Sequence, residues 1–135
     1  MKSMDIYLAG KIDSGEVSID EFAAELEDRG HRIGEKWWQQ GRLPKPYMEF
    51  PTTSAPAATA MIDAAYRSNV FVLFPEDTIL GAAVELGAAI ASTRQDPDKQ
   101  VIIVNPFDVR QSVFYAHPAV IAVEGIARVR AMDWF

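Results

Sequence analysis

Short apolar runs alternate with helical patterns along this chain. Continuous apolar residues occupy Ile6–Ala9, Val70–Phe74 and Val101–Val104, and the runs are closed by Gly10, by Pro75 and by Asn-Pro. Runs of this length, ended by such residues, are typical of strands buried on both faces of a sheet. Two weaker strands are expected at His31–Trp38 and Val120–Val123.

Helical patterns lie between these runs. The start of the first helix is indicated by Ser18 and Glu21, which have the spacing of a capping box, and Gly30 is placed to end it. Further helices are predicted at Ala57–Ser68, at Ala82–Ser92 and from about Glu124. Strands that alternate with helices predict one α/β domain over residues 1–135, with a parallel sheet covered by helices on both faces.

A long loop is predicted between the second strand and the second helix. Gly41–Pro56 carries four prolines and no sustained period, and loops of this length often bind ligands or act as lids. Trp37 and Trp38 beside it are candidates for stacking on a flat ligand, or equally for packing the loop onto the sheet. Arg42 and Lys45 within it are candidates for a phosphate contact, although solvated loop charges are the favoured interpretation.

Composition excludes several classes of function. The 135 residues include no cysteine, and 13 Lys and Arg against 19 Asp and Glu give a net charge of −6. This sign argues against a nucleic-acid polymer as partner, and no apolar stretch approaches the roughly 20 residues of a membrane helix. Thiol chemistry is excluded, and His31 and His117 lack metal-ligand spacing. We expect a cytoplasmic protein without a metal or another cofactor.

Glu85 is the candidate for chemistry. It is the only charged residue from Thr78 to Ile90, and a carboxylate in an apolar helix must be paired, neutralised or facing a cleft. The nearby helix start favours its ionised form by about 0.3–1 kcal/mol, which suits a nucleophile or a group that stabilises a developing cation. The alternative is a solvated glutamate that merely benefits from the helix dipole. Gly81, one turn earlier, would let a ligand approach the backbone.

Four blocks carry a family resemblance over nearly the whole chain. IYLAG at 6–10, VFVLFP at 70–75, GAAVELGAAIA at 81–91 and KQVIIVNP at 99–106 resemble, in this order, the nucleoside 2-deoxyribosyltransferase family. That family includes N-glycosidases similar to 2-deoxynucleoside 5-phosphate N-hydrolase. The resemblance implies a Rossmann-like or flavodoxin-like domain with a five-stranded parallel sheet, subunits that form a homo-oligomer, and cleavage of an N-glycosidic bond through a covalent glycosyl-enzyme.

The resemblance also implies roles for individual residues. Glu85 matches the nucleophile, Tyr7 the tyrosine that orients it, and Gly10 and Gly81 the glycines that line the sugar pocket. The partner is then a small nucleoside or nucleotide, and the acceptor, a second base or water, decides between transferase and hydrolase. Because ligands of parallel sheets bind beyond the carboxyl ends of the strands, the further candidates for substrate binding are Lys11, Trp37, Trp38, Pro75, Asp77 and Asn105.

Two positions depart from the family pattern. Met61 stands where the family usually has an acid, and Asp63 is the nearest carboxylate. Asp63, Glu76 or Asp77 could substitute for that acid, and Thr78 could supply a hydroxyl. Ile79 stands where the family has Asp or Ser, which predicts that nucleosides are used no worse than their monophosphates. Two alternatives therefore stay open: a catalytically degenerate nucleotide-binding module of the same fold, and a purely structural or interaction domain.

Overall fold

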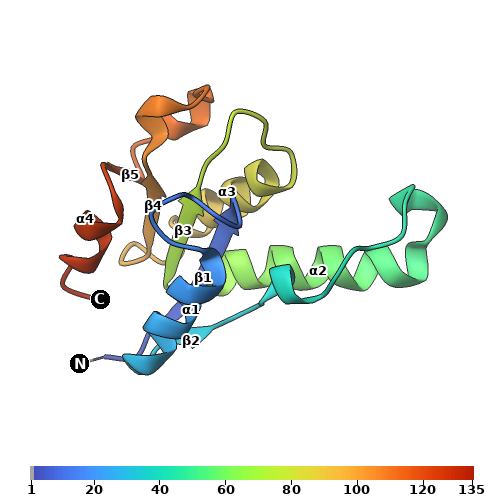
Figure 1. Cartoon of the computed structure of the whole chain (residues 1–135), viewed down its shortest axis with the longest axis horizontal. Helices are drawn as coiled ribbons and strands as arrows, with labels where there is room; N and C mark the ends of the chain where they lie inside the picture. Colours follow the sequence, from blue (N-terminus) through green and yellow to red (C-terminus); the bar gives the residue numbers. More distant parts are fainter. Residues whose placement is uncertain (1) are drawn as a thin grey trace.

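The computed structural model describes residues 2–135, and its centre is a five-stranded, all-parallel sheet (Figure 1). The strands lie in the order β2-β1-β3-β4-β5. Their bounds are β1 Asp5–Gly10, β2 Arg32–Ile33, β3 Val70–Phe74, β4 Gln100–Val104 and β5 Val120–Val123. The predicted α/β fold with a parallel sheet is therefore confirmed.

Helices cover both faces of this sheet. The α-helices are α1 Ile19–Asp28, α2 Pro51–Arg67, α3 Gly81–Ser92 and α4 Ile126–Arg130. Short 3₁₀ helices are η1 Trp37–Gln39, η2 Tyr47–Glu49, η3 Pro106–Asp108 and η4 Val113–Ala116. Side chains of α1 and α4 belong to one buried cluster, and side chains of α2 and α3 belong to the other.

Alternation along β1 shows how the sheet divides the core. Ile6 and Leu8 join the cluster of α1 and α4, whereas Tyr7 and Ala9 join the cluster of α2 and α3. All four are fully buried, because neighbouring side chains of a strand point to opposite faces and both faces are covered here. A tyrosine in the middle of β1 is therefore directed toward α3.

The start of α1 follows the sequence pattern. The Ser18 hydroxyl accepts a hydrogen bond of 3.1 Å from the backbone N–H of Glu21, and the face that contains Phe22 and Leu26 is buried. Gly30 has φ +95° just beyond the helix, a backbone conformation that favours glycine.

The second strand is much shorter than the predicted His31–Trp38, because a side chain replaces its continuation. The backbone N–H of Gly34 still donates to the Ile6 carbonyl at 3.1 Å. At the next step along β1, the Leu8 carbonyl accepts a hydrogen bond of 2.7 Å from the indole N–H of Trp37 instead. This bond satisfies the Leu8 carbonyl without a further residue of β2, and the chain turns into η1.

The predicted loop Gly41–Pro56 is also partly helical. It contains η2, and α2 begins at Pro51 rather than at Ala57. Proline is favoured in a first helical turn, and Pro56, one turn farther on, lies in an exposed part of the helix. Residues 47–59, here called the arm, project from the body (Figure 1), and Ala65 is the buried residue of α2.

The last helix, α4, is five residues long and starts later than the predicted Glu124. Gly125 has φ +82° and precedes α4, and the Glu16 carboxylate accepts a hydrogen bond of 3.3 Å from the Ile126 N–H. None of the helices within residues 2–135 has the length and apolar character that crossing a membrane requires.

Candidate active site

Tyr7 and Glu85, which are far apart in the sequence, meet where α3 lies over β1. The Tyr7 hydroxyl donates a hydrogen bond to Oε2 of Glu85. Tyr7 is fully buried, and its ring stacks on Phe71 with centroids 5.8 Å apart and planes within 2°. Phe71 is its register partner on β3. The hydroxyl is therefore held in one place by the sheet, and it fixes the carboxylate in turn.

The periodicity of α3 explains the position of Glu85. Gly81, Glu85, Ala89 and Ser92 fall on one side of the helix, and Ala89 and Ser92 are buried against the sheet. Glu85 is half-buried one turn earlier. Before it, a Cβ added to Gly81 would contact nothing within 4 Å. Open space thus begins at the end of α3 where the carboxylate lies.

Burial changes the charge state expected for Glu85. Desolvation raises its pKa from the ordinary 4.5 to about 7. The hydrogen bond from Tyr7 and the helix dipole favour the charged form, but removal from water outweighs them. The helix dipole therefore does not by itself decide the charge state of Glu85, and a pKa of about 7 leaves both protonation states populated near neutral pH.

The surroundings of this pair are apolar. Met61, Ile79, Ala82 and Trp37 pack against the cluster that contains Tyr7. Met61 and Ile79 occupy the two positions at which the resemblance implied polar or acidic groups, so these positions contribute packing. Low polarity around the carboxylate is also the physical cause of its raised pKa.

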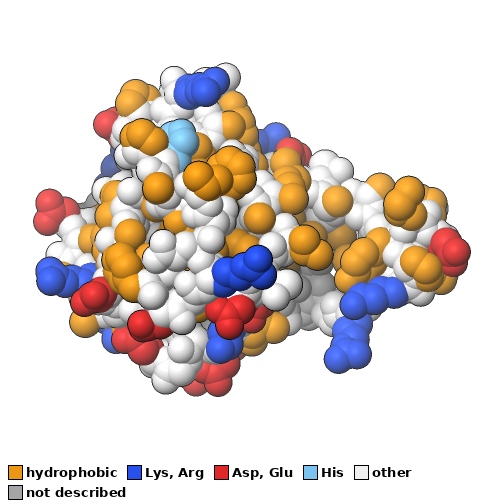
Figure 2. Space-filling model, turned by 90° about the horizontal axis from the view of Figure 1, so that it is seen from above, with side chains coloured by type: hydrophobic (Ala, Val, Ile, Leu, Met, Phe, Trp, Pro, Cys, Tyr) orange, Lys and Arg blue, Asp and Glu red, His pale blue; other side chains and the backbone are white. Residues whose placement is uncertain are grey.

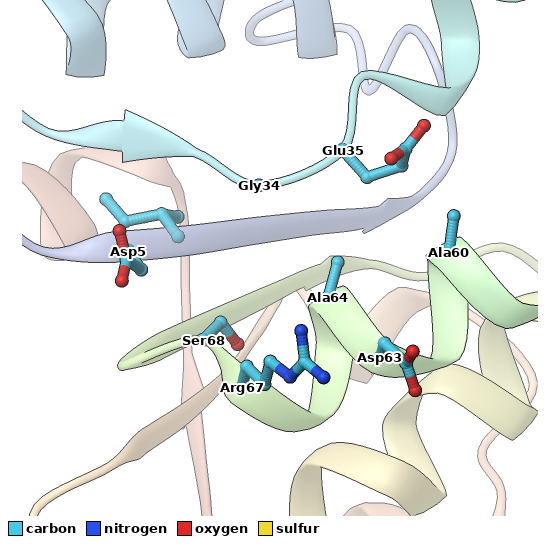
Figure 3. Close-up of a pocket in the computed structure, with 9 residues that line it drawn as sticks. Asp5, Gly34, Glu35, Ala60, Asp63, Ala64, Arg67 and Ser68 are labelled. Carbon is cyan, nitrogen blue, oxygen red and sulfur yellow. The ribbon is translucent and has the colours of Figure 1, made fainter.

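Asp63, the candidate for assisting the leaving base, lines a pocket that contains neither Tyr7 nor Glu85 (Figure 3). That pocket has a volume of about 350 Å³ and lies between α2 and the segment after β2, with Asp63 and Arg67 across from Gly34 and Glu35. Asp63 is exposed and stands two residues after Met61, about 200° farther around the helix. Its side chain therefore does not share the face that Met61 turns toward Tyr7.

The two tryptophans are held by different elements. Trp37 is half-buried and bonded to β1 as described, while the indole N–H of Trp38 donates to Asp20 of α1 at 2.9 Å. Their rings meet edge to face, with centroids 5.7 Å apart. Trp38 thus packs η1 onto α1. Trp37 lines a pocket of about 400 Å³ that is open to solvent and is here called the loop pocket; its lining is Trp37, Gln40, Gly41, Arg42, Leu43, Lys45, Tyr47 and Met61.

Three other candidates come together at the carboxyl ends of β1, β3 and β4. Lys11, Pro75 and Asn105 line one pocket of about 310 Å³. Asn105, however, has its side chain engaged within the protein: its amide N–H donates to Glu16 at 2.6 Å, and its oxygen accepts from the Gly125 N–H at 2.7 Å. Asn105 therefore joins two loops. Of these three candidates, Lys11 is the one that carries a charge.

Gly10 and Asp77 also serve the fold. A Cβ on Gly10 would overlap the carbonyl group of Phe74, and the residue has φ +99°, so close approach of β1 to β3 requires glycine there. The role of Gly10 in lining a sugar pocket stays a prediction. The Asp77 carboxylate accepts a hydrogen bond of 2.9 Å from the Arg110 N–H, which ties together the loops after β3 and β4.

Sequence reasoning missed the support that Phe71 gives to Tyr7. The signal was an aromatic residue in each of two neighbouring runs, but it becomes a contact only when the register Tyr7↔Phe71 is known. Within residues 2–135 no three His, Asp or Glu side chains gather as metal ligands would. No protein-family model matches this chain, and neither a curated protein nor a solved structure matches it.

Proposed function

We propose that this protein cleaves or transfers at the N-glycosidic bond of a nucleoside or nucleotide, with Glu85 as nucleophile and Tyr7 as the residue that positions it. The observation that carries the proposal is the hydrogen bond from a fully buried tyrosine to a half-buried carboxylate at an open helix end. A packing role does not explain the carboxylate, because burying it costs free energy that an apolar side chain would not cost.

The chemistry takes two steps. An Oε of ionised Glu85 bonds to C1′ of the sugar, the electrons of the C1′–N bond leave with the base, and the base takes up a proton from water. An acceptor base or water then attacks C1′ and loses its proton, the ester bond breaks, and the Glu85 carboxylate is restored. The raised pKa of Glu85, about 7, reflects a weakly solvated carboxylate, which is a better nucleophile than a solvated one.

A second candidate is a nucleotide-binding module of the same fold without catalysis. It is favoured by the apolar packing of Met61 and Ile79, and by the place of Asp63 in another pocket. In that case the Tyr7–Glu85 pair would be retained for binding a sugar hydroxyl.

We propose further that the protein acts in the cytoplasm as a homo-oligomer. Large apolar side chains are exposed on the arm, as with Met48 (95%), and at the start of α3, as with Leu80 (82%) just before the helix and Val84 (60%) in its first turn. Figure 2 shows apolar groups along the arm and the body beside it. A helix so little buried as α2 gains its stability when another surface covers it. Light scattering that gives the mass of one chain at micromolar concentration would refute this association.

Base release tests the enzyme proposal. Ribo- and deoxyribonucleosides and their 5′-monophosphates are incubated with the protein, with and without a second base, and free base is followed by chromatography. Glu85→Ala should abolish release, whereas Glu124→Gln, an exposed control, should retain it. If no substrate releases base, the enzyme proposal is refuted and the binding module is favoured. If Glu85→Ala releases base as fast as the unaltered protein, Glu85 is not the nucleophile.

A further inference from the structure

The lining of the loop pocket is more positively charged than that of four other pockets, of which the one with Arg94 has a single cation. Its lining contains two cations, Arg42 and Lys45, and no carboxylate. The pocket that contains Arg67 also contains Asp5, Glu35 and Asp63, and the one that contains Lys11 also contains Glu16 and Asp108. On a chain of net charge −6, this pocket is a local site of positive potential.

Neither cation forms an ion pair with a carboxylate of residues 2–135. The ion pairs of residues 2–135 are Arg32–Asp5, Lys36–Glu27 and Arg130–Glu25, and both Arg42 and Lys45 are exposed. Figure 2 shows basic side chains on the projecting part of the molecule, beside the recess that separates it from the body. An anion that entered the pocket would therefore meet two cations with no carboxylate partner to displace.

Aromatic rings stand beside these charges. Tyr47 is 50% exposed, and the Lys45 ammonium lies 5.6 Å from the centroid of its ring. Trp37 is the second aromatic residue of the lining. Rings of this kind stack on nucleobases at about 1–3 kcal/mol per base in single-strand binders. The lining thus suits a ligand that carries both a flat ring and an anionic group.

The loop pocket borders the cluster that contains Tyr7 through two shared side chains. Trp37 and Met61 line it, and the same two side chains pack against the cluster that contains Tyr7. We propose, on the basis of the proposed function, that Arg42 and Lys45 hold the phosphate of a nucleoside monophosphate, which is then the preferred substrate class over the free nucleoside. This revises the expectation drawn from Ile79, since the phosphate contact comes from another segment.

Calorimetric binding to the Glu85→Gln protein tests this proposal without turnover. The common deoxynucleosides, their 5′-monophosphates and inorganic phosphate are titrated in parallel. The monophosphate should bind more tightly than its nucleoside, and Arg42→Gln/Lys45→Gln should weaken it roughly five- to thirtyfold while leaving the nucleoside unchanged. The preference should also shrink between about 50 and about 200 mM salt.

Two further variants separate the contributions. Arg94→Gln/Arg128→Gln removes two exposed cations outside the loop pocket and should leave the preference intact. Tyr47→Ala should weaken nucleoside and monophosphate alike, because it removes a ring and no charge.

The proposal is overturned if the monophosphate shows no binding at millimolar concentration, if it binds no better than the nucleoside, or if Arg42→Gln/Lys45→Gln keeps the preference. Base release by the unaltered protein is scored separately. A monophosphate whose binding depends on Arg42 and Lys45 but which is never cleaved would support this site and refute the proposed enzyme. Cleavage of nucleosides and monophosphates at equal efficiency would support the proposed enzyme and refute this phosphate site.

Discussion

Replacing Glu85 by glutamine should make the protein more stable at alkaline pH and leave its stability nearly unchanged at acid pH. Glutamine has the shape of glutamic acid and keeps an oxygen that accepts from the Tyr7 hydroxyl. It cannot ionise, so it removes the cost of a charge in an apolar site. The experiment thereby separates the electrostatic environment of residue 85 from its packing.

The magnitude follows from linkage between protonation and folding. Folding raises the pKa of Glu85 from 4.5 to about 7, so the folded state holds this proton more tightly than the unfolded state. The free energy of unfolding therefore falls as pH rises through this interval and is constant above it. The full interval corresponds to about 3 kcal/mol. Since Glu85 is only half-buried, solvent reduces the expected gain to about 1–3 kcal/mol.

Urea unfolding, followed by circular dichroism at about pH 4, 6 and 8, measures this effect. The difference between Glu85→Gln and the unaltered protein should be near zero at the lowest pH and largest at the highest. Glu124→Gln, at an exposed position, provides the control and should follow the unaltered protein throughout. A constant difference across the range, or a less stable Glu85→Gln protein at the highest pH, would refute the argument that Glu85 is desolvated.

Three further predictions concern the same elements. Base release should rise with pH through about 7 if ionised Glu85 is the nucleophile; a fall over that range in the pH profile would instead assign it a protonated, acid role. Gly10→Ala should lower the free energy of unfolding by about 2–4 kcal/mol in urea titrations, because its Cβ would overlap the Phe74 carbonyl at φ +99°; a loss below about 0.5 kcal/mol would contradict the close approach of the two strands. Trp37→Phe should cost about 1–3 kcal/mol and speed hydrogen exchange at the edge of β1, because the Leu8 carbonyl loses its donor; unchanged exchange there would show that the indole does not complete this edge.

Local pattern was sufficient for most of the fold. Continuous apolar runs identified β1, β3 and β4, since a strand buried on both faces needs no polar residue, and Ser18 with Gly30 marked the ends of α1. The pattern failed where a non-local group took over. It predicted too long a second strand, because the sequence does not reveal that the Trp37 indole satisfies the Leu8 carbonyl.

For the site, the sequence by itself determined that Glu85 is an isolated carboxylate in an apolar helix, and the resemblance added Tyr7. Tertiary structure decided the rest, because register and helix rotation are not local properties. It joined Tyr7 to Glu85, placed Asp63 in another pocket, and engaged Asn105 in loop contacts. It also raised the pKa of Glu85, since desolvation depends on what the fold packs around a group, whereas the chain order supplies only the helix dipole.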